Sequence, residues 1–205
     1  MAEAKVHEAH VTGHETSTGL PSTKLAMWLF LASDCLFFGA LISTYVLYRG
    51  TSKVGPYPGD VFDIPYTSVS SFVLLASSLT MVLALSAFQR GDMPRGRLWL
   101  VATAMLGLTF VGGQAYEFTA FHREGLSLQT NLFGSSFFVL TGFHGAHVAI
   151  GILMLLSLVS FSYTGKLGED PSFPVELVGL YWHFVDIVWI VIFTVVYLIP
   201  TPSPA

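Results

Sequence analysis

Long apolar runs alternate with short polar connections along this chain. Five runs are long enough to cross a bilayer as helices, because about 20 residues at a rise of about 1.5 Å suffice. They cover residues 24–48, 68–89, 98–121, 133–161 and 175–199. The connections are too short for an extramembrane domain. The pattern predicts an all-α, polytopic membrane protein with a single five-helix transmembrane domain at residues 24–199 and a C-terminal tail at 200–205.

The first 23 residues are polar and contain no apolar stretch typical of a secretory signal peptide. His7, His10 and His14 are spaced three and four apart, so on a short helix they could face one way and capture a metal ion. Glycines and a proline, including Gly13 and Pro21, interrupt any such helix. We therefore expect residues 1–23 to form a disordered tail.

The composition agrees with a membrane protein. Hydrophobic residues make up 53 % of the chain and charged residues 11 %, whereas soluble domains carry about 25 % charged residues. The net charge of −4 is mild and gives no indication of nucleic-acid binding. The single cysteine, Cys35, excludes an intrachain disulfide and a cysteine-based metal cage.

The distribution of Lys and Arg predicts the orientation of the bundle. Six of these residues lie in the N-terminal tail, the second loop and the fourth loop, and three lie on the other side. Cytoplasmic loops of membrane proteins carry the excess of positive charge. The N-terminus is therefore expected on the cytoplasmic side and the C-terminus outside.

Several ionisable residues fall near the middle of the predicted spans. An Asp at the centre of such a helix disfavours insertion by roughly 2.5–3.5 kcal/mol, so these groups must pair or lose their charge. At about 1.5 Å per residue, all of them lie within a narrow band of depth: Asp34, His144, His147, His183 and Asp186. We expect Asp34 to meet His147 or His183 across an interhelical contact.

Three interpretations of this polar cluster remain open. The residues could form structural hydrogen bonds between helices, each worth about 0.6 kcal/mol in a membrane. The pairs His144-x-x-His147 and His183-x-x-Asp186 also have the spacing of metal or haem ligands on one helix face. The third interpretation is proton handling, because carboxyl and imidazole groups at mid-depth are the material of proton relays. Asp34 is the best candidate for that role.

Other polar and aromatic residues lie near the ends of the spans. Gln114 and Glu117 share one face at the outer end of the third span, where we expect Glu117 to be a solvated rim residue. Trp28, Trp99 and Trp182 have positions typical of anchors at the membrane interface.

Two long motifs resemble a known family. Residues 134–138 (GSSFF) and 141–148 (TGFHGAHV) resemble the penultimate helix of subunit III of the haem-copper oxidases, and residues 181–189 (YWHFVDIVW) resemble its last helix. Ser33-Asp34, and residues 112–118 (GGQAYEF), are similar to two shorter elements of that family. The resemblance spans residues 24–199 and fits the five-helix bacterial form.

The resemblance implies a respiratory protein of the bacterial cytoplasmic membrane that binds no haem or copper itself. Haem and copper are then expected in partner subunits of a proton-pumping terminal oxidase, which include catalytic subunit I, subunit II and small subunits. In the family, subunit III holds phospholipid, sustains proton uptake and protects the catalytic centre during turnover. Two alternatives remain, an accessory protein of a nitric-oxide reductase and an autonomous membrane enzyme that uses a His/Asp metal site.

The resemblance also implies that Asp34 is the functional carboxyl of the family. His144, His147, His183, Asp186 and Glu117 are the other matching polar positions, and none of them is expected to be catalytic. Asp34 departs from the Glu that is usual in the family. The acid is retained, but its side chain is one methylene shorter.

Overall fold

A computed structural model of the chain describes residues 19, 21–50 and 62–199. Its long helices are α1 (Ser22–Tyr48), α3 (Ile64–Gln89), α4 (Met93–Arg123), α5 (Leu132–Thr164) and α6 (Ser172–Phe193), and a short π-helix, η1 (Thr194–Leu198), continues α6. Within the described residues, five helical spans are long and apolar enough to cross a membrane. The all-α, five-span prediction is therefore confirmed. The N-terminal histidines and the C-terminal tail lie outside the described residues.

The helices begin where capping residues place them. Asp63 and Asp92 cap α3 and α4, and each side chain accepts a hydrogen bond from the backbone N–H three residues later. Pro65 and Pro94 follow in the first turn, where a missing N–H leaves no helical bond unmade. Both helices therefore start about one turn before the apolar runs at 68–89 and 98–121. Hydropathy indicates which residues lie in the bilayer, whereas the capping residues determine where the helix begins.

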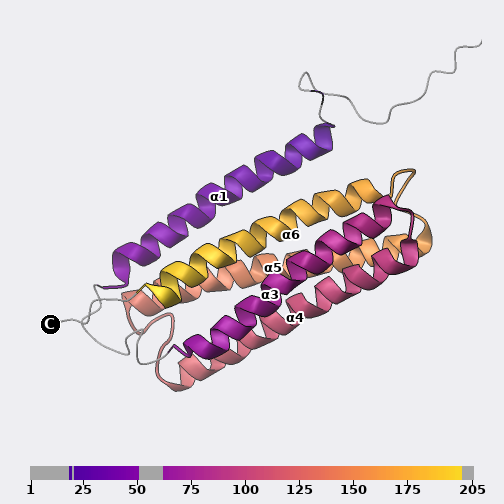
Figure 1. The fold of residues 1–205 in the computed structure, drawn as a ribbon. Helices are drawn as coiled ribbons and strands as arrows, with labels where there is room; N and C mark the ends of the chain where they lie inside the picture. The colour runs from indigo at the N-terminus through magenta and orange to yellow at the C-terminus, as the bar shows by residue number, and fades with distance from the viewer. Residues whose placement is uncertain (1–18, 20, 51–61, 200–205) are drawn as a thin grey trace, which may run out of the picture.

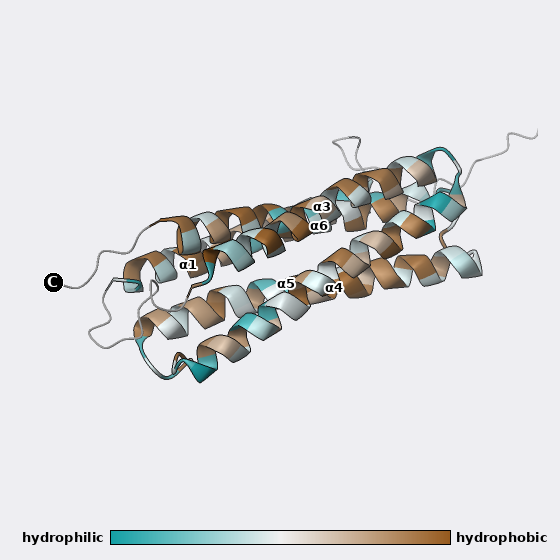
Figure 2. Ribbon diagram, turned by 60° about the horizontal axis from the view of Figure 1, so that its bottom comes forward, coloured by the Kyte–Doolittle hydropathy of each residue, from teal (hydrophilic) through white to brown (hydrophobic). Residues whose placement is uncertain are grey.

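Four of the helices form a bundle, and the fifth lies beside it. α3 packs against α4 and α6, and α5 packs against the same two helices, whereas α1 makes its main contacts with α5 and α6 (Figure 1). The described loops at the two ends of the bundle are mostly polar, and the helices between them are mostly apolar (Figure 2). In α1 only 11 % of the most apolar window is buried, against 33–44 % in the other spans. Most of α1 therefore faces surroundings outside this chain.

Trp182 fills the centre of the four-helix bundle. A Cβ atom added at Gly107 of α4 would lie 2.6 Å from the indole ring, and one added at Gly151 of α5 would lie 2.9 Å from it. The indole Nε1 donates a hydrogen bond of 2.9 Å to Ser77 Oγ of α3. All four bundle helices therefore meet at this one α6 side chain.

The position of Trp182 corrects the expectation that it anchors the chain at the membrane interface. Trp182 is 1 % exposed, whereas Trp28 on α1 is 50 % exposed. The expectation failed for two reasons. The helix α6 begins at Ser172, before the apolar run at 175–199, and Trp182 lies on the face of α6 that packs against the other helices. Trp189, two turns further along α6, donates to Ser71 Oγ of α3 in the same way, at 2.9 Å.

Polar contacts near both ends of α1 attach it to the last span. Lys24 Nζ lies 2.6 Å from Glu176 Oε1 of α6. Arg49, just beyond the other end, donates from Nη1 to the backbone oxygen of Val195 at 3.3 Å. These contacts fix the height of α1 against α6, and thereby the height of Asp34 within the bundle.

Candidate functional site

Asp34 of α1 faces His147 of α5. The carboxylate oxygen Oδ2 lies 3.7 Å from Nε2, and the two side chains are only 13 % and 16 % exposed. His147 Nδ1 lies 2.7 Å from the backbone oxygen of Phe143. Because a carbonyl oxygen can only accept, Nδ1 carries a proton and Nε2 is left to face Asp34. The pair can therefore hold one further proton, either on the carboxyl or on Nε2.

Aromatic side chains surround this pair where α1, α5 and α6 meet. The ring of Phe38 lies edge-on to His147, with 4.9 Å between centroids. Tyr181 of α6 donates its hydroxyl to the backbone oxygen of His147 at 3.0 Å. Asp34 Oδ2 has no hydrogen-bond partner among the described residues. The separation of 3.7 Å exceeds the length of a direct hydrogen bond, so a small approach of α1 to α5 would complete one.

His183 and Asp186 of α6 share a hydroxyl group of α3. Ser78 Oγ donates to Asp186 Oδ2 and lies 3.2 Å from His183 Nδ1. Asp186 is 5 % exposed, and its second oxygen, Oδ1, is buried without a partner in the described part of the chain. Of the two partners expected for Asp34, the structure brings His147 to it and places His183 beside Ser78.

His144 lies in an aromatic enclosure, separated from the other polar residues. It is fully buried and stacks on Trp189 with 4.9 Å between ring centroids, while Phe110 meets it edge-on at 5.9 Å. Neither ring nitrogen has a hydrogen-bond partner among the residues described. Phe38 contacts the rings of both His144 and His147, at 6.4 and 4.9 Å between centroids, but only His147 faces Asp34. Within the described ranges, no three His, Cys, Asp or Glu side chains come close enough to hold a metal ion.

Gln114 and Glu117 are buried, so the expectation that Glu117 is a solvated rim residue was wrong. Each is 7 % exposed. Gln114 Nε2 donates to the backbone oxygen of Thr141 at 2.7 Å, and Glu117 Oε1 lies 2.5 Å from Thr67 Oγ1. Two features of α4 explain this. The helix continues past Glu117 to Arg123, and Glu117 lies on the face of the helix that packs against α3.

Sequence reasoning missed the hydroxyl groups of α3. Thr67, Ser71 and Ser78 lie four and seven residues apart, on one face of the helix. They bond to Glu117, Trp189 and Asp186 respectively. Hydroxyl groups commonly join helices in membranes, and their spacing along α3 was the signal that could have indicated this face.

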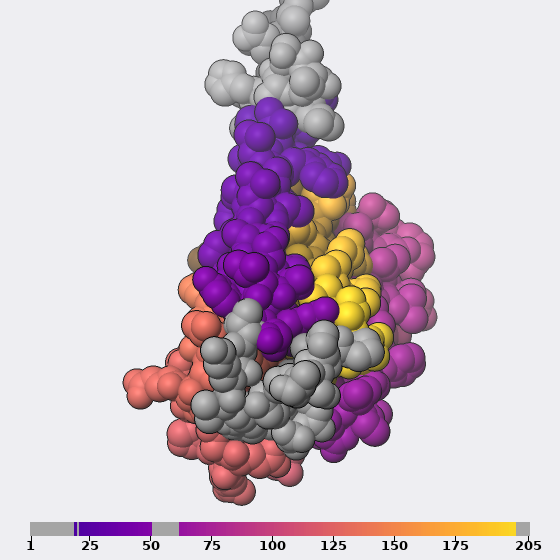
Figure 3. Space-filling view, turned by 90° about the vertical axis from the view of Figure 1, so that its left-hand side faces the viewer, coloured from indigo at the N-terminus to yellow at the C-terminus, as the bar shows by residue number. Residues whose placement is uncertain are grey.

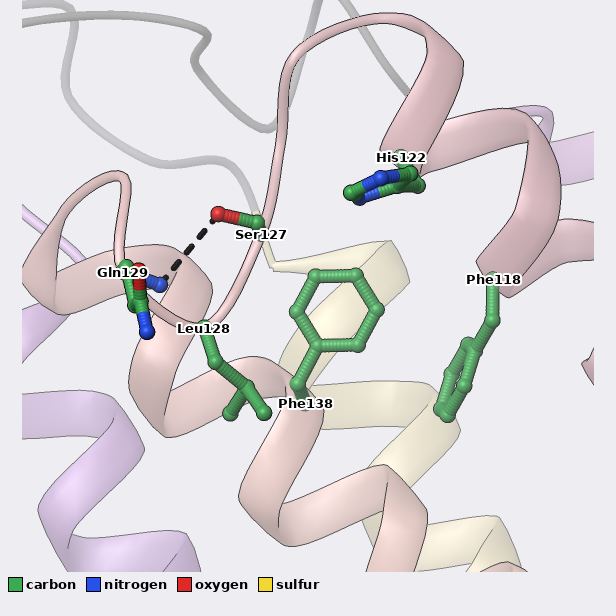
Figure 4. Close-up of a pocket in the computed structure, with 6 residues that line it drawn as sticks. All are labelled: Phe118, His122, Ser127, Leu128, Gln129 and Phe138. Atoms are coloured by element: carbon green, nitrogen blue, oxygen red, sulfur yellow. Dashed lines mark hydrogen bonds between the residues drawn. The ribbon is translucent and has the colours of Figure 1, made fainter.

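A pocket of about 490 Å³ opens beside the loop between α4 and α5. Figure 4 shows its lining residues, Phe118, His122, Ser127, Leu128, Gln129 and Phe138. The rings of Phe118 and Phe138 pack edge-on at 5.0 Å. Polar groups thus border an apolar floor, and the volume lies within the range of about 300–1,000 Å³ usual for ligand sites.

Comparison with known proteins identifies the family. The family model described as cytochrome c oxidase subunit III matches residues 3–200. Subunit 3 of the cytochrome bo(3) ubiquinol oxidase of Pseudomonas aeruginosa is 37 % identical over 194 residues, which are 93 % of each chain. Cytochrome c oxidase subunit 3 of Bacillus sp. (strain PS3) is 39 % identical over 176 residues, which cover 85 % of this chain and 84 % of that one. Quinol oxidase subunit 3 of Bacillus subtilis is 36 % identical over 174 residues, 85 % of each. The chain therefore belongs to the cytochrome c oxidase subunit III family, the third subunits of haem-copper terminal oxidases.

Proposed function

We propose that this chain is the non-redox accessory subunit of a proton-pumping oxygen reductase, in which it packs against the catalytic subunit and stabilises it. Subunit II and small subunits complete the complex, and haem and copper belong to the partners. Relatives from three bacteria are named as oxidase subunits, which favours an oxidase over a nitric-oxide reductase. The electron donor is either cytochrome c or a quinol, because relatives of both kinds occur.

The Asp34–His147 pair is the observation that carries the proposed role in proton uptake. Its two groups lie 3.7 Å apart inside the membrane-spanning part and can hold one exchangeable proton between them. A proton that moves from the carboxyl to Nε2 leaves a carboxylate beside an imidazolium, and the net charge of the pair stays constant. Such a transfer needs no cofactor. Asp34 and His147 are therefore the residues we assign to supporting proton uptake by the neighbouring subunit.

The pocket beside the α4–α5 loop is our candidate for bound phospholipid. Its floor is formed by Phe118 and Phe138, which suit an acyl chain, and His122 lies at the same end of α4 (Figure 4). The end of a span is where a lipid head group meets the membrane–water interface. An acyl chain against the rings and a phosphate beside the imidazole would satisfy both parts of the site.

The proposed orientation places the N-terminus in the cytoplasm of a bacterium and the C-terminus outside the inner membrane. Arg97 lies at the end of the bundle that this orientation makes cytoplasmic. It donates from Nη2 to the backbone oxygen of Ser162 at 2.7 Å and lies 4.3 Å from the ring centroid of Tyr163. Positive charge and aromatic rings gather at such interfaces. In this arrangement the five spans form one transmembrane domain.

Metal analysis of the separated chain tests the assignment as a non-redox subunit. We expect the intact complex to contain haem and copper, and the chain dissociated from it to contain no stoichiometric iron, copper or zinc. The polar residues of the spans bond to hydroxyl groups, aromatic rings and backbone oxygens rather than converging on one point. A stoichiometric metal in the separated chain would contradict the proposal and favour the autonomous metal enzyme.

A further inference from the structure

One stripe of the last span, along α6 and the start of η1, is only partly covered by the chain's other helices. Its residues are spaced three and four apart along the whole span, and each of them is half-buried or exposed: Glu176, Leu180, His183, Ile187, Ile190 and Thr194. The helices α3 and α1 flank α6 (Figure 3). From Glu176 to Thr194 the stripe is about 27 Å long at 1.5 Å per residue, close to the thickness of a bilayer core of about 30 Å.

The middle of the stripe is polar. His183 lies near the centre of the span Ser172–Leu198, and its Nδ1 faces Ser78, which lies near the centre of α3. Beside them, the buried oxygen Oδ1 of Asp186 has no partner among the described residues. A partly exposed imidazole at this depth is costly against hydrocarbon, because acyl chains neither donate nor accept hydrogen bonds.

The flanks of the polar centre are apolar. Ile187 is 59 % exposed and Ile190 is 42 % exposed. A hollow of about 230 Å³ between α3 and α6 continues the surface past Ile190 and is lined there by Phe72, Leu75 and Phe193. The surface therefore offers a polar contact at mid-depth with apolar contact beside it, along the length of a membrane-spanning helix.

We infer that a membrane-spanning helix of another oxidase subunit lies along this stripe, between α1 and α3. It places one hydrogen-bond donor, such as an amide, hydroxyl or cationic side chain, against His183. A lipid does not meet this requirement, because its polar head group lies at the interface, about 15 Å from the bilayer centre. The inference rests on the proposed accessory role, since a chain acting alone would have no partner helix to offer.

Photo-crosslinking in the intact complex tests this inference. The variant Ile187→p-benzoylphenylalanine places a photoreactive ring on the stripe, one turn from His183. The matched control is Met105→p-benzoylphenylalanine on α4, because Met105 is 58 % exposed and also lies near the middle of its span. We expect the Ile187 variant to crosslink to a membrane helix of another subunit, with a yield several-fold above that of the control. Equal yields, adducts with lipid only, or crosslinks to a second copy of this chain would overturn the inference.

A second pair of variants probes the polar contact itself. Without crosslinking, His183→Leu is expected to release the subunit that crosslinking identifies at a lower detergent concentration than the unmodified complex does. His183→Gln, which keeps hydrogen-bonding capacity, is expected to retain that subunit. Equal retention by both variants would overturn the polar contact. If no other subunit purifies with the unmodified chain, the accessory role itself fails. If the subunits purify together and the Ile187 variant does not crosslink to them, only this inference fails.

Discussion

We expect Trp182→Ala to lower the free energy of unfolding of this subunit by about 3–5 kcal/mol, the range for truncation of a large buried aromatic residue. The indole packs against Gly107 and Gly151 and bonds to Ser77, so its removal leaves a cavity shared by four helices. Glycine at positions 107 and 151 offers no side chain to fill that space. Thermal unfolding of the purified subunit in mild detergent measures the change.

Two further substitutions control this measurement. Trp28→Ala removes the same side chain from an exposed position on α1 and should leave stability almost unchanged. Trp182→Phe keeps most of the ring volume and loses the bond to Ser77, which is expected to cost about 1 kcal/mol. If Trp182→Ala were no more destabilising than Trp28→Ala, Trp182 would not be the centre of the bundle.

The second large effect is expected in turnover. Asp34→Ala should leave the haem content of the complex intact and slow proton uptake, or shorten the active life of the oxidase, several-fold. The substitution removes the carboxyl group that faces His147, and with it one of the two places where the pair holds a proton. Asp34→Glu restores the acid and should recover most of the activity. Proton-uptake kinetics and the number of turnovers before inactivation are the quantities to compare.

Ser33→Ala is the matched control for Asp34, because the Ser33 hydroxyl bonds to the backbone oxygen of Phe30 in its own helix. A double-mutant cycle between Asp34 and His147 gives an independent measurement of their contact. Interhelical polar pairs in membranes couple by about 0.6 kcal/mol on average and about 1.7 kcal/mol at most. Unchanged turnover together with coupling near zero would show that Asp34 has no role in proton uptake.

The fold could be predicted from the sequence because each span carries its own signal. A run of apolar residues long enough to cross a bilayer identifies a helix without reference to any neighbour. The helix starts were less accurate, since Asp63 and Asp92 begin helices before the apolar runs do. Capping side chains determine those boundaries, and hydropathy does not record them.

The candidate site could be predicted only in part. Counting residues along a span gives the depth of Asp34 and His147. The two residues belong to different spans and lie at similar depth. Depth does not give rotation about the helix axis. For that reason Glu117 was expected to be solvated and Trp182 at the interface, although both side chains point into the bundle. Partners such as Ser78 were missed because a hydroxyl group in an apolar span carries little signal of its own.

Mild detergent purification through this chain, followed by an optical spectrum and identification of the accompanying polypeptides, is the most direct test of the central claim. We expect a haem spectrum and a large polytopic subunit that purifies with the chain in equal amounts. Recovery of the chain from its native membrane alone and without colour, under conditions that keep other respiratory complexes intact, would contradict its role as an oxidase subunit.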